Sequence, residues 1–353
     1  MKSKVLKYIN LKAISMSKKL IALSLLTFVV ISSCKKDKVS TQPAPTAAQP
    51  QLKFVFKFDS TQNRLDAFGQ VNNTLPAGHQ AQSPHFNGMS VHHIEMAQGI
   101  ATQVGFGAVL YTTPTTPTSP IIVWNSSHTA SQTYTDAINF NQETIVADGQ
   151  QFFSIPLSQV TAGTYQYLRV SVAYQNYDIK YGILPNTPIS VTYTTPAGST
   201  YYSSGTIASF IGYNTQIGSY TIKTQTDAVN GSKQQGYWTF ESAPYFGFTV
   251  PYSKGQAPQG ATTVVNPLFA SSAVPPGSCL VTGQFINQAG TTATPLVITG
   301  NETSDVIITV SLSTKKSFEW VKHSSPNDNN IYPLNGDTVV DMGVRGMMPK
   351  LPN

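Results

Sequence analysis

Four of the six histidines in the chain are concentrated in one short stretch. They are His79, His85, His92 and His93. Met89, Met96 and Glu95 lie among them. Imidazole combined with a thioether suits copper, and imidazole combined with a carboxylate suits zinc. The stretch is therefore a candidate transition-metal site, with copper or zinc as the cofactor.

Strand geometry limits how these histidines could share one ion. If residues 90–96 form a strand, neighbouring side chains point to opposite faces. His93 would then lie beside Glu95, and His92 beside Met96. One ion would take the two histidines that precede this strand and only one of the adjacent pair. Because the spacings match no fixed metal motif, the alternative is two surface histidines and one strand histidine bonded to Glu95.

A second candidate site is the aromatic pair Tyr237 and Trp238, which Gln235 and Glu241 flank. Exposed aromatic rings beside polar side chains can stack on sugar rings or on apolar ligands. The alternative is that these rings belong to the core and form cross-strand pairs. The sequence therefore names two ligand-binding candidates without deciding whether either is exposed.

Signals of catalysis are few. The sequence holds no HExxH, no GxSxG and no glycine-rich phosphate loop. An enzyme would need a cleft in which carboxylates such as Glu95, Asp136, Glu143 or Glu241 converge, with at least one displaced pKa. The spacing places no two of them together. We therefore favour a non-enzymatic protein, with an enzyme that acts on envelope glycans as an alternative.

The N-terminus has the features of a targeting segment. Lys18 and Lys19 precede an uncharged apolar run, residues 20–31. The length of this run fits a signal-peptide core and is short for a membrane span of about 20 residues. The run ends in the sequence ISSC at residues 31–34, which resembles the bacterial lipobox.

The lipobox resemblance implies acylation of the Cys34 thiol and cleavage before it. Residues 1–33 are therefore predicted to be a signal peptide, with Met16 as an alternative start. Two or three acyl chains, at about 0.8 kcal/mol per buried methylene, anchor a protein stably. Residues 34–51, rich in Pro, Ala, Thr and Gln, are predicted to form a disordered tether.

The start of this tether, CKKD, resembles that of lipoproteins of the Bacteroidetes type. The resemblance implies an outer-membrane lipoprotein, on the periplasmic face or at the cell surface, held to the membrane through lipid on Cys34. A small ligand or an envelope protein is then the expected partner.

The composition excludes several classes of protein. Only 11% of the 353 residues are charged, against roughly 25% in an average soluble domain. The net charge of +6 belongs to the leader, because its six lysines account for the excess of 22 basic over 16 acidic residues. Without the leader the chain is neutral, so we expect no basic surface for nucleic acid.

Beyond the tether, hydrophobic residues recur with period two in short runs that Gly, Pro, Asn and Ser punctuate. Examples are residues 52–58, 165–174 and 305–312. This pattern predicts an all-β, antiparallel sandwich with few short helices. Residues 52–190 and 191–353 form either two adjoining β domains, with a boundary near 183–200, or two halves of one sandwich. Cys279 is predicted to be a buried structural thiol.

Two resemblances concern the body of the chain. Residues 164–171, 233–238 and 341–346 resemble a group of Bacteroidetes lipoproteins that have no assigned activity. The first half is more distantly similar to MbnP-like copper-associated domains, through the strand at residues 52–58 and the Gly-x-Tyr turn at 163–165. This second resemblance implies a copper-associated β fold. We therefore expect a lipid-anchored, all-β envelope protein that binds a ligand or partner, with metal binding as an alternative.

The substitution Cys34→Ala tests the anchor. The acyl chains are the only membrane-binding element that the sequence predicts after cleavage, so the variant should move from the membrane to the soluble fraction on cell fractionation. A Cys279→Ala variant should stay at the membrane. Membrane association of an intact Cys34→Ala chain would contradict the lipoprotein prediction.

Overall fold

The computed structural model describes the chain from residue 49 onward, with gaps. The described residues are 49–66, 69, 71–98, 120–130, 133–183, 188–190, 193–194, 201–242, 252–257, 277–321, 332–333 and 338–352. Residues 48–353 form one compact unit. The predicted signal peptide, Cys34 and most of the predicted tether lie outside the described residues.

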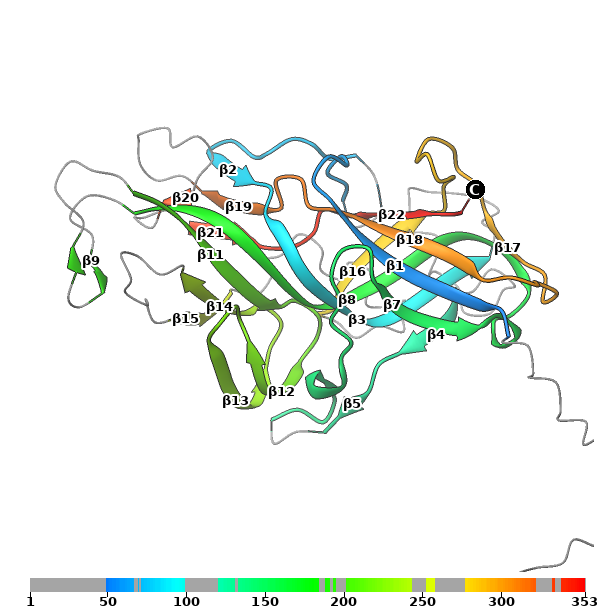
Figure 1. The fold of residues 1–353 in the computed structure, drawn as a ribbon, viewed down its shortest axis with the longest axis horizontal. Helices are drawn as coiled ribbons and strands as arrows, with labels where there is room; N and C mark the ends of the chain where they lie inside the picture. Colours follow the sequence, from blue (N-terminus) through cyan, green and yellow to red (C-terminus); the bar gives the residue numbers. More distant parts are fainter. Residues whose placement is uncertain are drawn as a thin grey trace, which may run out of the picture. The chain divides into compact units, whose positions relative to one another are not determined.

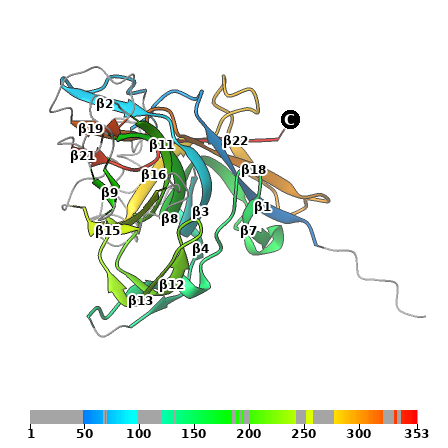
Figure 2. The same cartoon turned by 60° about the vertical axis from the view of Figure 1, so that its left-hand side comes forward.

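The strands build an all-β sandwich, which confirms the predicted fold class (Figures 1 and 2). A four-stranded sheet has the order β22 (Met347–Lys350), β18 (Val306–Ser313), β1 (Gln51–Asp59), β7 (Gln151–Pro156). A nine-stranded sheet has the order β15 (Ser253–Gln256), β14 (Tyr237–Ser242), β11 (Tyr201–Phe210), β8 (Gly163–Ile183), β3 (His85–Gln98), β4 (Pro120–Asn125). Its remaining strands, which pair with β8, are β16 (Cys279–Gln284), β17 (Leu296–Ile298) and β20 (Tyr332–Pro333).

Three smaller sheets complete the described fold. The first has the order β13 (Thr226–Lys233), β12 (Thr215–Thr221), β6 (Ala137–Asn139), β5 (His128–Thr129). The second has the order β2 (His79–Gln82), β19 (Phe318–Val321), β21 (Thr338–Asp341), and the third pairs β10 (Tyr193–Thr194) with β9 (Pro188–Ser190). The helical elements of the described residues are two short 3-10 turns, η2 (Phe140–Gln142) and η3 (Leu157–Gln159). Within the described chain, no helix is long and apolar enough to cross a bilayer.

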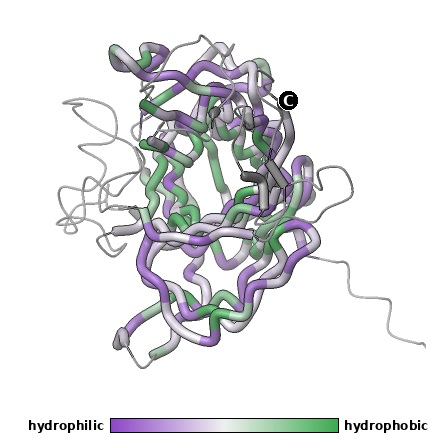
Figure 3. The backbone as a smooth tube through the Cα atoms, turned by 90° about the vertical axis from the view of Figure 1, so that its left-hand side faces the viewer, coloured by the Kyte–Doolittle hydropathy of each residue, from purple (hydrophilic) through white to green (hydrophobic). Residues whose placement is uncertain are grey.

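The larger core lies between the four-stranded sheet and β8, and the more hydrophobic stretches gather toward the middle (Figure 3). Leu52, Phe54 and Phe56 alternate along β1 and are fully buried, as the period-two pattern predicts. Each such side chain contributes about 1.5–3 kcal/mol of hydrophobic free energy. β1 pairs with β18 in parallel, although the chain order separates them widely, so both halves of the sequence build one sheet.

β8 changes partner at Ala173. Along one edge it pairs first with β17 and β16, and then, beyond Ala173, with β11. The Ala173 carbonyl accepts the backbone N–H groups of Ile211 and Gly212. A Cβ on Gly212 would lie 2.8 Å from the Ala173 Cα, so this close approach requires glycine. The expected boundary near residues 183–200 therefore falls between two adjacent strands of one sheet, β8 and β11.

The predicted orientation of Tyr174 is wrong. The alternation predicts that Leu168, Val170, Val172 and Tyr174 share a face. The β3–β8 register shifts between Ser90 and Val91, however, and Ala173 is the extra residue in β8 at this shift. A bulge inverts the alternation beyond it. Tyr174 consequently enters a second, smaller core with Phe140, Phe210, Ile217 and Tyr220. This core packs β12 and η2 against the other face of the nine-stranded sheet.

A buried ionic cluster ties β2, β19 and β21 to neighbouring loops. Glu319 accepts hydrogen bonds from Arg64 Nη2 at 2.9 Å, Arg345 Nη2 at 3.0 Å and His79 Nδ1 at 2.6 Å. Asp341 binds the other arm of Arg345. Burial opposes ionisation of Glu319, but His79 and the two guanidinium groups outweigh it and lower the pKa of this carboxyl.

The substitution Glu319→Gln tests the weight of this cluster. It would leave two buried guanidinium groups short of negative charge, and breaking a buried ion pair costs about 3 kcal/mol or more. We expect urea unfolding to show a loss of that size. Asp305→Asn, which removes the exposed partner of Lys53, is the matched control and should change stability little. Equal losses in the two variants would contradict the assignment.

Candidate functional site

The adjacent histidines His92 and His93 lie on one face of the sheet, contrary to the alternation predicted from sequence. Val91 pairs with Val172 and His93 with Ser171, so His92 is an extra residue in β3. Its Nε2 lies 2.7 Å from Ser171 Oγ, on the side of the sheet that carries His93. A bulge of this kind turns two successive side chains to the same side.

His93 makes the contact with Glu95 that the sequence predicted. Its Nε2 lies 2.8 Å from Glu95 Oε1, and its Nδ1 bonds to the side chain of Asn125. The second oxygen of Glu95 lies 3.5 Å from Arg169 Nη1. All these groups except Asn125 are nearly fully buried. His93 therefore belongs to a chain of two hydrogen bonds and one ion pair that links β4, β3 and β8.

His92 is neutral at physiological pH. Burial lowers its pKa well below the ordinary range, and the neighbouring His93 and His128 act in the same direction. The rings of His92 and His128 have centroids 5.7 Å apart. His128 Nδ1 lies 2.8 Å from Asp136 Oδ1. His128 is not a candidate from the sequence, because it lies well away from the other histidines along the chain. Only the fold brings it beside His92.

The two remaining histidines of the candidate metal site lie elsewhere. His85 pairs with Asp178 and His93 with Ser171, so eight residues of strand separate these histidines, a length of roughly 25 Å. His79 lies on β2 and bonds to Glu319. The structure thus does not bring the four histidines together.

The two methionines of the stretch face away from its adjacent histidines. Met89 and Met96 are buried in the larger core, on the opposite face of β3 from His93. They cannot serve as copper ligands beside the histidines without a change of strand register. Over the described ranges, no group of three or more His, Cys, Asp or Glu side chains is placed to hold a metal ion.

Glu143 is the carboxylate with the most displaced pKa among those considered from sequence. It follows η2, and both carboxyl oxygens are buried without a well-formed hydrogen bond. Burial raises the pKa of Glu143 from 4.5 to about 7, while the hydroxyls of Ser126 and Ser90 beside it act in the opposite direction. Glu143 is therefore a proton-binding group inside the fold.

The other three carboxylates have structural partners. Glu95 and Asp136 each bond to a histidine, as described above. Glu241 accepts the backbone N–H groups of residues 223–225 and holds that turn. Burial opposes ionisation of Glu241, but these bonds and the Thr224 hydroxyl outweigh it and lower its pKa. Glu95, Asp136 and Glu241 are thus each engaged by a group of the protein itself.

The aromatic pair is divided between the two faces of β14. Tyr237 is nearly fully buried in the smaller core, and its hydroxyl donates to Asp227 Oδ2 at 2.7 Å. Asp227 also accepts from Tyr252 and Lys254, both at 2.8 Å. Tyr237 is therefore a structural residue, and its predicted role in ligand binding has no support from this geometry.

Trp238 has a different environment. Of the three tryptophans, Trp320 is fully buried and Trp124 stacks on Phe153 with ring centroids 5.0 Å apart. Trp238 is half-buried and belongs to neither hydrophobic core of the described chain. It pairs across the ladder with Gly255. A Cβ on Gly255 would lie 2.8 Å from Trp238 Cζ2, so the indole rests directly on the β15 backbone.

The indole N–H of Trp238 donates to no acceptor within the described chain. The indole nitrogen is also not one of the buried atoms that lack a hydrogen-bond partner, so it is accessible to solvent. Phe240 lies on the same face, two residues along β14, and packs edge-to-face on Tyr181 with centroids 5.3 Å apart. Ser253 pairs with Phe240 and places an exposed hydroxyl residue at this edge. We call Trp238, Phe240, Gly255 and Ser253 the aromatic platform.

Comparison with known proteins adds no assignment: no protein-family model, curated protein or solved structure matches the chain. The buried histidines, Glu95 and Glu241 bond to neighbouring strands and turns, whereas the indole N–H of Trp238 has no acceptor within the described chain.

The variant Glu143→Gln tests the buried carboxyl. Because the folded-state pKa is raised, ionisation opposes folding. The contribution of Glu143 to stability is greatest below pH 4.5, falls as pH rises from 4.5 to about 7, and is about 3 kcal/mol lower by pH 8. The variant should therefore exceed the parent in stability at pH 8 and match it near pH 4.5 in urea unfolding. Glu302→Gln, at an exposed carboxyl of lowered pKa, should give no such gain at pH 8.

Proposed function

We propose that the protein is a non-enzymatic, lipid-anchored envelope protein whose β-sandwich binds a neutral saccharide at the aromatic platform. The predicted lipid on Cys34 would hold it to the outer membrane, and the tether would let the folded unit reach its ligand. The observation that carries the proposal is the position of Trp238, half-buried and resting on Gly255 outside both cores.

The platform has the chemistry that sugar recognition needs. A sugar ring has an apolar face of C–H groups and a rim of hydroxyls. The apolar face can stack on the indole face that points away from Gly255, and the hydroxyls can bond to the indole N–H and to Ser253. Aromatic side chains that combine a large apolar surface with one donor suit such amphipathic ligands.

Binding without catalysis fits the surrounding carboxylates. Glu241 is the acidic residue nearest to Trp238 in the sequence, three positions along β14. Its carboxylate is engaged by the turn at residues 223–225 and by the Thr224 hydroxyl. It is therefore not free to protonate a glycosidic oxygen. This supports a ligand-binding role over glycan hydrolysis.

The test is saccharide binding by the parent protein and three variants. A glycan array identifies the saccharide, and a titration followed by tryptophan fluorescence measures its Kd. Trp238→Ala should weaken binding about tenfold or more, because truncating an aromatic residue that anchors a ligand costs about 2 kcal/mol or more. Gly255→Ala should also weaken binding, since its Cβ displaces the ring while Trp238 is retained.

Trp124→Phe is the matched control, because it alters the other incompletely buried tryptophan. This variant should bind like the parent. Failure of the parent to bind any neutral saccharide on the array would contradict the proposal. Unchanged binding by Trp238→Ala would contradict it as well.

A further inference from the structure

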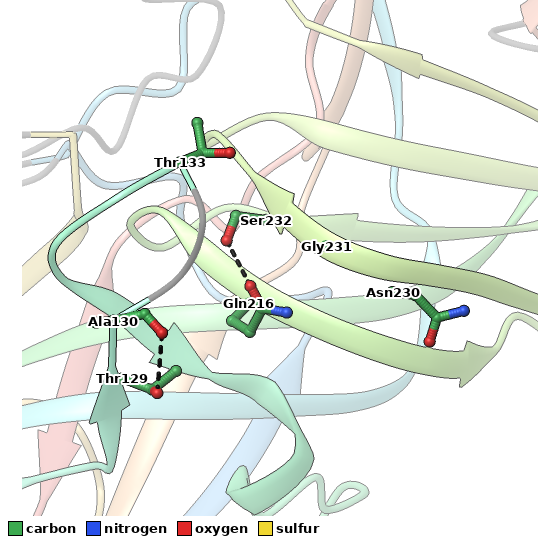
Figure 4. Close-up of a pocket in the computed structure, with 7 residues that line it drawn as sticks. All are labelled: Thr129, Ala130, Thr133, Gln216, Asn230, Gly231 and Ser232. Atoms are coloured by element: carbon green, nitrogen blue, oxygen red, sulfur yellow. Dashed lines mark hydrogen bonds between the residues drawn. The ribbon is translucent and has the colours of Figure 1, made fainter.

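A hollow of about 600 Å³ lies beside β12 and β13, and its described lining includes no residue of the aromatic platform (Figure 4). Its volume is in the range of small-molecule sites. Of the residues that the structure describes, seven line it: Thr129, Ala130, Thr133, Gln216, Asn230, Gly231 and Ser232. None of them is titratable, and five have a hydroxyl or a carboxamide. The lining therefore offers hydrogen bonds without charge.

The backbone at the hollow is held in an unusual conformation. Ile217 pairs with Gly231 and Ser219 with Ala228, so β13 has one residue more than β12 between these pairs. Asn230 lies in this bulge with φ of 47°. A non-glycine residue in the left-handed region costs about 1 kcal/mol or more, and Asn tolerates it better than most residues. Bulges of this kind redirect a side chain.

The hydrogen-bonding groups of the lining are incompletely used by the protein. Ser232 Oγ donates to Gln216 Oε1 at 2.6 Å, which leaves the Gln216 nitrogen free and pointing away from Ser232 (Figure 4). The Asn230 side chain is exposed and bonds to no other part of the described chain. Thr129 donates to the Ala130 carbonyl at 3.2 Å, so its oxygen still has acceptor capacity.

We infer that this hollow is a second binding site, for one or two rings of a neutral saccharide. Carboxamides and hydroxyls both donate and accept, as sugar hydroxyls do, so each can exchange a water bond for a ligand bond. An acidic sugar would find no cation among the described lining residues. The described lining of the hollow shares no residue with the aromatic platform, so binding at one site can be tested independently of binding at the other.

A nuclear magnetic resonance titration of the purified protein separates the two sites. Maltose and lactose are the neutral probes, and glucuronate is the acidic one. The side-chain amide signals of Gln216 and Asn230 report on the hollow, and the indole N–H signal of Trp238 reports on the platform. We expect the amide signals to shift with a neutral disaccharide, to shift equally in a Trp238→Ala variant, and to respond less to glucuronate.

Two variants remove the ligand contacts without disturbing the fold. Asn230→Gly deletes the carboxamide and places at this φ the residue that adopts it most readily. Gln216→Ala deletes the other amide. Each should weaken binding at the hollow about fivefold, the equivalent of one hydrogen bond. Thr226→Ala is the control, since it removes a hydroxyl from the same hairpin but outside the lining.

Two results would overturn the second site. One is the absence of shifts at Gln216 and Asn230 with both neutral probes. The other is parent-like binding at the hollow by the correctly folded Asn230→Gly variant. If the amide signals shift and the Trp238 signal does not, the hollow binds these disaccharides and the platform does not.

Discussion

The pairing of the long strand β8 is the constraint on which the rest of the structure depends. A strand of 21 residues presents one backbone donor and one acceptor per residue, and buried groups of this kind must be paired. β8 meets this need with β3 on one edge and with β17, β16 and β11 in succession on the other. The change from β16 to β11 at Ala173 coincides with a bulge. That bulge decides which side chains enter the larger core and which enter the smaller one.

The irregular pairing also explains the buried polar chemistry. The extra residue His92 in β3 places a second imidazole on the face that carries His93, Ser171 and Glu95. Polar groups removed from water must find partners inside the protein. They do so with one another, and the neutral state of His92 follows from its burial. A cluster that suggests metal chemistry by composition thus serves to fasten three strands together.

The ionic cluster around Glu319 also pairs polar groups that the fold removes from water. Arg64 and Arg345 come from loops, and Glu319 and Asp341 come from β19 and β21. Their charges balance in a buried location, so each depends on the others. The indole of Trp238 and the carboxamides of Gln216 and Asn230 are neutral groups whose hydrogen-bonding capacity the described residues do not fully use.

Much of the architecture follows from the sequence alone. The alternation along residues 52–58 and 305–312 determined both the strands and their buried faces, because side chains in a strand repeat with period two. The contact between His93 and Glu95 was predictable for the same reason. Long-range pairing was not, because local patterns do not encode which strands meet. The parallel pairing of β1 with β18 and the approach of His128 to His92 are examples.

The functional residues divide in the same way. Sequence composition singled out Tyr237 and Trp238 but could not separate them, since an exposed and a buried ring look alike in a list of residues. Their alternation along β14 places Tyr237 in the smaller core and Trp238 on the opposite face, where the indole rests on Gly255 and belongs to neither core of the described chain. The bulges at His92, Ala173 and Asn230 had no local signal. Each arises where two paired strands differ in length by one residue, and only tertiary structure fixes that difference.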